Sequence, residues 1–272
     1  MPAMRRIAMI SAVFMILTGY ACPALPAFAS RWSPTETGGG ELRRIAVVID
    51  DFGSAMKGTE EILSLPIPIT AAVMPFLPTT RRDAEEAHRR GHEVIVHLPM
   101  EPIRGKRSWL GPGAITTDLS DEEIRKRVNA AIDDVPHARG VNNHMGSKAT
   151  ADPRVMRIVM DVCRERGLYF LDSRTSPRSQ AAAEAERVGV PLVDNDLFLD
   201  EVYSASHVHK QLRKLALSID RQPDIIVIGH VGPPGLITAA ALRSAIPNLR
   251  EDADFVRLSE MLPEPAPLLK WK

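Results

Sequence analysis

Short apolar runs alternate with longer polar or amphipathic stretches along most of the chain. Four of the longer stretches have the periodicity or the terminal residues of helices: 80–90, 120–134, 152–167 and 204–220. Elements that alternate in this way indicate βαβ units and a parallel sheet, either closed as a (β/α) barrel or open. The apolar runs have the length and the turn-forming flanks of buried parallel strands, and they occupy 45–49, 69–74, 93–97, 140–143, 168–171, 191–193 and 225–228.

The two ends of the chain differ from this pattern. Two arginines precede an apolar run at 7–17, and the small-residue site Ala27-Phe28-Ala29 follows, which predicts a secretory signal peptide over 1–29. The run is too short to favour a membrane span, although an uncleaved anchor is the alternative. We therefore expect a periplasmic or secreted protein without a transmembrane span in its mature form. Its expected parts are a flexible leader at 30–42, one domain at 43–262 and a proline-rich tail at 263–272.

Charge and cysteine content narrow the function classes. The 272 residues include 34 lysines and arginines and 34 aspartates and glutamates, and this balance argues against a nucleic-acid partner. Two cysteines, one of them inside the predicted signal peptide, exclude a disulfide framework. The remaining one, Cys163, is expected to be a small buried residue.

Polar side chains follow six of the seven predicted strands. Because the carboxyl ends of parallel strands meet at one face, these groups are expected to become neighbours. A single aspartate or histidine there is more often a cap or a structural group. Several carboxylates at one place repel one another, however, and a bound cation removes that repulsion. The groups are Asp50 and Asp51, His97, Asn142 to His144, Asp172 to Arg174, Asp194 to Asp196, and His230.

Imidazole and carboxylate together are a ligand set that suits zinc, and a hydrolytic zinc centre needs three protein ligands, a base and an acid. The ligands can come from Asp51, His97 and His144. Asp50, next to a ligand, is the expected base.

The last strand can supply the acid of such a centre. We expect His230 to protonate the leaving group. Asp172 is expected to hold that imidazole in the correct tautomer and to raise its pKa.

Five short motifs, in order, are similar to those of the divergent polysaccharide deacetylase family of bacterial envelope proteins. They are Ile-Asp-Asp-Phe-Gly, His-Leu-Pro-Met-Glu, Asn-Asn-His-Met-Gly-Ser, Phe-Leu-Asp-Ser-Arg-Thr and Gly-His-Val-Gly-Pro, and the resemblance covers 45–258. It implies a distorted (β/α) barrel with about seven parallel strands. It also implies a divalent metal, for which we expect zinc, and an acetylated envelope polysaccharide or oligosaccharide as substrate.

The chain departs from the wider polysaccharide deacetylase superfamily at two places. The second metal-binding histidine of that superfamily is replaced by Glu101, and Asn142-Asn143-His144 stands where its third motif has an arginine near the base. Glu101 is therefore the rival of His144 as third ligand, and we favour His144. Arg174, from the next strand, is the hypothetical replacement for the arginine. The residues expected to contact substrate are Glu101, Asn143, Arg174 and Asp194.

These observations favour a periplasmic metal-dependent deacetylase that removes acetyl groups from an envelope glycan. The missing histidine supports an alternative, a catalytically silent metal-binding protein that binds a glycan or an envelope partner on the same fold. A third hypothesis is glycosidic hydrolysis by Asp172, Asp194 and Asp196. Trp109, in a Gly/Pro-rich segment, is expected either to stack on a sugar ring or to anchor its own loop.

Overall fold

The structure, a computed structural model, describes residues 43–263. The predicted signal peptide and leader, and all but the first residue of the predicted tail, lie outside this range. Within it, nine strands form one sheet in the order β6-β5-β4-β3-β2-β1-β8-β7, with β9 beside the start of β1. Every one of these pairings is parallel. The strands are β1 (Arg44–Phe52), β2 (Thr70–Val73), β3 (Glu93–Met100), β4 (Ala138–Met145), β5 (Tyr169–Asp172), β6 (Leu192–Asp194), β7 (Leu197–Phe198), β8 (Asp224–His230) and β9 (Asp254–Val256).

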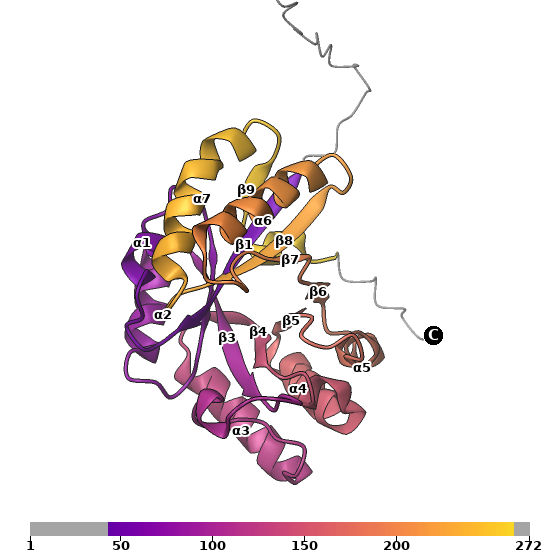
Figure 1. Ribbon diagram of the computed structural model, residues 1–272. Helices are drawn as coiled ribbons and strands as arrows, with labels where there is room; N and C mark the ends of the chain where they lie inside the picture. The colour runs from indigo at the N-terminus through magenta and orange to yellow at the C-terminus, as the bar shows by residue number, and fades with distance from the viewer. Residues whose placement is uncertain (1–42, 264–272) are drawn as a thin grey trace, which may run out of the picture. The chain divides into compact units, whose positions relative to one another are not determined.

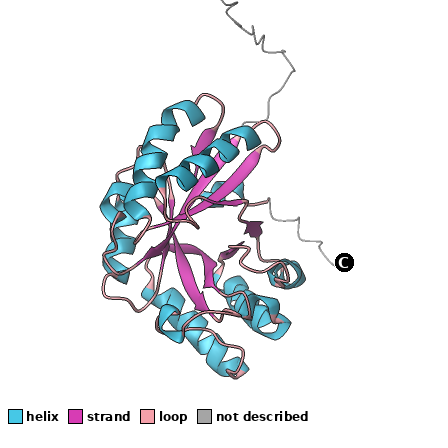
Figure 2. Ribbon diagram, viewed as in Figure 1, coloured by secondary structure: helices cyan, strands magenta, loops and turns pink. Residues whose placement is uncertain are grey.

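Helices cover the outer side of the curled sheet, as Figures 1 and 2 show. They are α1 (Thr59–Leu63), α2 (Thr80–Arg89), α3 (Asp121–Asp134), α4 (Pro153–Arg166), α5 (Ala181–Val188), α6 (Ala205–Ser218) and α7 (Gly235–Leu249). Three short 3-10 helices complete the described chain: η1 (Arg107–Trp109), η2 (Ala149–Ala151) and η3 (Leu258–Met261).

The predicted distorted (β/α) barrel is confirmed. All seven predicted strands are present, as β1 to β6 and β8, and the short strands β7 and β9 were not predicted. The sheet ends at β6 and β7, and the chain passes directly from one to the other through Asn195 and Asp196. The backbone therefore bridges the gap between the two edge strands of the barrel.

The four predicted helices are also present, as α2, α3, α4 and α6, and local chemistry explains the start of α3 and both ends of α4. The Ser120 hydroxyl accepts a hydrogen bond from the Glu123 N–H at the start of α3. At the start of α4, the Asp152 carboxylate accepts from two backbone N–H groups. Gly167 then ends α4 in the left-handed conformation, with φ 65°. Cys163 is buried in this helix, as expected.

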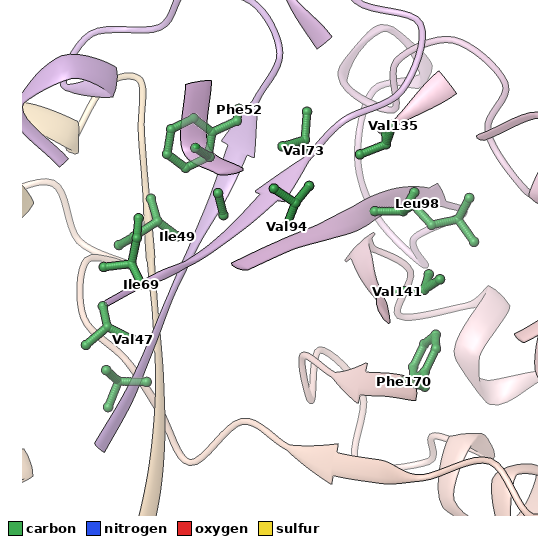
Figure 3. Packing of buried hydrophobic residues seen from close by; sticks show 14 of the residues in the cluster. Val47, Ile49, Phe52, Ile69, Val73, Val94, Leu98, Val135, Val141 and Phe170 are labelled. Atoms are coloured by element: carbon green, nitrogen blue, oxygen red, sulfur yellow. The ribbon is translucent and has the colours of Figure 1, made fainter. Parts of the chain in front are cut away.

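Side chains along each strand alternate between two apolar cores, as the two-residue period of a strand requires. The outer core lies between strands and helices and includes Val47, Ile49, Val94 and Phe170, which Figure 3 shows. The inner core lies inside the barrel and is formed by other strand residues together with Leu258 and Met261 of η3.

The inner core positions the functional groups. Ala46 and Val48 of β1 belong to it, and the next inner position on that strand is Asp50. In the same way, Ile228 of β8 precedes His230 by two residues. The strands thus change from apolar to polar inner side chains at their carboxyl ends, where the candidate site lies.

Candidate metal and catalytic site

A bulge in β1 turns two consecutive carboxylates toward the same centre. In a regular strand Asp50 and Asp51 would point to opposite faces. Between Ile49 and Phe52, however, β1 contains one residue more than its partner β2, and Asp51 adopts the left-handed conformation with φ 71°. Both carboxylates consequently approach the imidazole of His97, Asp50 Oδ2 at 3.6 Å and Asp51 Oδ1 at 3.3 Å from Nε2.

The two histidines come from neighbouring strands in register. His97 of β3 pairs with Asn142 of β4, and His144 lies two residues further along β4, which places it on the same face as Asn142. The His144 Nδ1 atom lies 3.0 Å from His97 Nε2 and 3.1 Å from Asp51 Oδ1. Three potential ligand atoms therefore meet within 4.8 Å of one another.

The donor set of this cluster fits a metal ion. Asp51 Oδ1 is buried and, within residues 43–263, has no hydrogen-bond partner of acceptable geometry. Such an atom costs free energy unless something binds it. Burial alone would raise the pKa of Asp51, but the nearby imidazoles of His144 and His97 hold it well below its ordinary value. An ionised carboxylate facing two imidazole nitrogens is an arrangement suited to a divalent cation.

Hydrogen bonds on the far sides of both rings fix their tautomers. The Nε2 atom of His144 lies 3.1 Å from the carbonyl oxygen of Trp109, which can only accept, so this nitrogen is the donor. His97 Nδ1 lies 2.8 Å from Asn142 Oδ1 and donates to it in the same way. The amide orientation of Asn142 follows because its Nδ2 donates to the Asp50 carboxylate at 2.9 Å. Burial lowers the pKa of His97, but Asp50 and Asp51 outweigh it and raise this pKa, so the ring gains a proton readily when no cation is bound. Once deprotonated, each ring turns a lone pair toward the cluster.

Asn142 lies beside Asp50, the expected base, where the resemblance implies an arginine. Asp50 is only 2 % exposed, and burial raises its pKa, while positive charge on His97 and His230 offsets part of this effect. The hypothesis that Arg174 approaches the base is wrong, because the Arg174 guanidinium instead pairs with Asp194 at 3.4 Å on the exposed rim.

His230 is oriented by Asp200 and not by Asp172, which corrects the sequence-based expectation. The Nδ1 atom of His230 lies 2.7 Å from Asp200 Oδ1, and Asp200 Oδ2 accepts from the His230 N–H and from the Thr238 hydroxyl. Burial would lower the pKa of His230, but the bond to fully buried Asp200 and the charge of Asp50 outweigh it and raise this pKa to about 9. An imidazole that is protonated at neutral pH can act as a general acid.

Asp172 lies on the other face of its strand. It follows Phe170 by two residues, and Phe170 packs in the outer core, whereas Leu171 packs in the inner core. The Asp172 carboxylate accepts from the Arg174 N–H at 2.8 Å, as a turn-forming aspartate does.

Two residues expected to contact substrate have structural tasks. Asn143 is buried, and its amide hydrogen-bonds to the backbone of Met145 and Ser173; its contact with substrate stays a prediction. Glu101 accepts from the Thr117 N–H and hydroxyl and pairs with Lys148 at 2.8 Å. The structure therefore brings His144, and not Glu101, to Asp51 and His97.

Comparison with known proteins places the chain in a family. The model of the family described as divergent polysaccharide deacetylase matches residues 47–262, most of the chain. The chain belongs to this family. The sequence is also 36 % identical over 222 residues to the uncharacterised Escherichia coli protein YibQ, an alignment that covers 82 % of this chain and 68 % of YibQ.

Solved structures share the fold of this family member. An uncharacterised protein of Agrobacterium tumefaciens superposes with a TM-score of 0.74 at 22 % identity, over 83 % of this chain and 91 % of that one. A polysaccharide deacetylase of Bacillus cereus superposes with a TM-score of 0.50 at 12 % identity, over 82 % and 96 % of the two chains. Identities this low show the fold alone. Across residues 43–263, no helix combines the length and the apolar character that crossing a bilayer requires.

Proposed function

We propose that the chain is a metal-dependent deacetylase that hydrolyses acetyl groups on an envelope glycan outside the cytoplasm. The observation that carries the proposal is the convergence of Asp51, His97 and His144, with the far nitrogen of each imidazole hydrogen-bonded so that the other ring nitrogen faces the cluster. The family to which the chain belongs supports a glycan as substrate. The signal-peptide pattern at 1–29 supports export, although it lies outside the described residues.

The three ligands would hold a divalent cation, and zinc suits two imidazoles and one carboxylate. Bound there, such a cation would polarise the acetyl carbonyl and acidify an attacking water. The orphaned oxygen of Asp51 is the clearest sign that the residues fit this role.

Asp50 is the base in this proposal. Asn142 binds one of its oxygens, Oδ1, and leaves Oδ2 facing the ligand cluster, 3.6 Å from His97 Nε2. Because burial raises the pKa of this carboxylate, it accepts a proton from water more readily than an exposed aspartate would.

His230 is the acid, and it comes from β8, the strand next to the one that carries the base. Asp50 and His230 are register partners on β1 and β8, so the proton acceptor and the proton donor start from neighbouring positions at the carboxyl ends of their strands. With Nδ1 bonded to Asp200, the Nε2 atom of His230 is the one that gives its proton to the leaving amine or alcohol.

One further candidate function is supported by specific residues. Glu101 stands where the superfamily carries a second metal-binding histidine, and neutral Asn142 stands beside the base where an arginine is expected. These departures favour a catalytically silent, metal-binding glycan receptor on the same fold.

Acetate release separates the two functions. Zinc-loaded protein should release acetate from at least one acetylated glycan in a panel of N-acetylated and O-acetylated polymers. The Asp50→Asn variant should bind zinc and keep the parent's circular dichroism spectrum but release none. Glycan binding without acetate release by the parent would establish the silent receptor. Unchanged activity of Asp50→Asn would refute the assignment of the base.

A further inference from the structure

The connection between β3 and α3 forms a long loop that is closed at its base. Glu101 Oε2 accepts from the N–H and the hydroxyl of Thr117, both at 2.8 Å, so one carboxylate joins the two ends of the segment 102–116. Lys148 pairs with the other oxygen of Glu101 at 2.8 Å. Glu101, the sequence-based rival for the metal, instead holds the loop together.

This closed loop lies directly against the proposed ligand cluster. Near its middle, the carbonyl oxygen of Trp109 accepts from Nε2 of His144 at 3.1 Å. Near its start, the Ile103 N–H donates to the Ser147 hydroxyl at 2.9 Å. A molecule that places an acetyl group at the cluster would therefore also meet this loop.

The loop presents cations and apolar surface together. Its charged residues are Arg104, Lys106 and Arg107, without an acidic residue from 102 to 117. The side chains of Ile103 and Trp109 are large and exposed, at 55 % and 57 %. The Lys106 ammonium lies 5.7 Å from the centre of the Trp109 ring, within the range of a cation–π contact.

The loop cations differ from those elsewhere on the same face. Lys148 and Arg174 are both paired with carboxylates. In contrast, no ion pair between residues 43 and 263 involves Arg104 or Lys106. The chain as a whole has no net charge, so this excess of positive charge is local to the rim of the site. Uncompensated cations beside a site raise the local concentration of anionic ligands.

We propose that this loop selects an anionic glycan, a polymer whose sugars carry carboxylate or phosphate groups near the acetyl group to be removed. Arg104 and Lys106 would meet the negative groups, and the exposed indole of Trp109 would pack on the apolar face of a sugar ring. The inference rests on the proposed function, because the loop is assigned to the substrate through its contact with His144.

Binding to matched oligosaccharides tests this selection. The probes are the neutral tetramer of N-acetylglucosamine and a tetrasaccharide of alternating N-acetylglucosamine and N-acetylmuramic acid, which carries carboxylates. Titration calorimetry on the zinc-loaded full chain, in the Asp50→Asn background, measures binding without turnover. We expect the anionic probe to bind at least about fivefold more tightly at low salt, with the preference shrinking as salt is added.

Loop variants then locate the preference. Arg104→Gln with Lys106→Gln should remove it and leave the neutral probe unaffected, whereas Trp109→Ala should weaken both probes. Lys126→Gln with Arg164→Gln, which removes the same charge from the exposed faces of α3 and α4, is the matched control and should change neither affinity.

Three binding results would overturn the proposal. The first is equal affinity of the parent for the two probes, and the second is a preference that survives the loop variants. The third is binding to phosphatidylglycerol vesicles that depends on the same cations while neither glycan binds, since the loop would then be a membrane contact. Acetate release by the zinc-loaded parent is measured separately. If the parent prefers the anionic probe but releases no acetate, deacetylation is refuted while the anionic selection is supported. If the parent releases acetate from the neutral probe alone, the selection is refuted.

Discussion

The replacement of Asp200 by asparagine isolates the group that keeps His230 protonated. Asp200 is fully buried and holds His230 through both the backbone N–H and ring Nδ1. Asparagine has nearly the same shape but carries no charge. Asp172→Asn is the matched control, because it makes the same change at the aspartate that the sequence pattern predicts as the partner.

The magnitude follows from the raised pKa. The pKa of His230 is about 9 in the folded chain against an ordinary value of 6.5. Each pH unit between these values corresponds to about 1.4 kcal/mol, so the protonated ring stabilises the fold by roughly 3 kcal/mol. Because the pKa is higher in the folded state, this contribution is complete below pH 6.5 and is lost as the pH rises through about 9.

Two measurements on metal-free protein check this reasoning. Titration of the His230 ring by NMR should give a pKa near 9 in the parent and in Asp172→Asn, and a clearly lower pKa, near the ordinary value, in Asp200→Asn. Urea unfolding between about pH 6 and pH 10 should show a loss of roughly 3 kcal/mol in the parent that is largely absent in Asp200→Asn. An unchanged ring pKa in Asp200→Asn, or an equal fall in Asp172→Asn, would refute the assignment.

Other substitutions separate ligand, base and packing roles. His144→Ala removes one of three ligand atoms and should weaken zinc binding at least about tenfold in equilibrium dialysis, while Glu101→Ala should bind zinc normally; the opposite result would make Glu101 the third ligand. Asn142→Asp keeps the oxygen that accepts from the His97 ring but loses the N–H that donates to Asp50. Acetate release should therefore fall about tenfold or more while zinc stays bound, and a loss of zinc would contradict this role of Asn142. Phe52→Ala empties a fully buried position and should lower the free energy of urea unfolding by about 3–5 kcal/mol, whereas a cost below about 1 kcal/mol would show that the outer core relaxes.

The long elements of the fold were predictable because their patterns are local. Runs of valine and isoleucine define β1, β3 and β8, and caps such as Asp152 mark helix starts. The helix α7 was missed because its apolar residues lie on several sides and give little amphipathic contrast. The helix α1 has five residues and β7 has two, too few for a period to show.

The error over the partner of His230 has a particular physical origin. The triplet Phe-Leu-Asp occurs twice, at 170–172 and at 198–200. In β5 the phenylalanine packs in the outer core, so Asp172 faces away from the barrel interior. In β7 Phe198 packs against the inner core, so Asp200 faces His230. The side of the sheet that each aspartate faces depends on how its strand pairs with neighbouring strands, and the local sequence does not contain this information.

The two-residue period of a strand also could not predict that Asp50 and Asp51 both approach one histidine. The needs of a hydrolytic zinc centre assigned Asp50 the role of base and Asp51 the role of ligand, while the geometry that brings both to His97 depends on a bulge between β1 and β2. In contrast, His97 and His230 follow directly from counting inner positions along their strands.

Asp51 also bears on how this chain evolves. Its left-handed backbone costs about 1 kcal/mol, and its buried, unsatisfied oxygen costs about 1–3 kcal/mol more. Glycine at this position would relieve both, so drift under selection for folding alone would lead away from aspartate. An aspartate at this position is therefore what the proposed cation site would require, with or without hydrolysis. A cation that satisfies the oxygen returns part of the cost, which couples the thermal stability of the fold to the supply of metal around it.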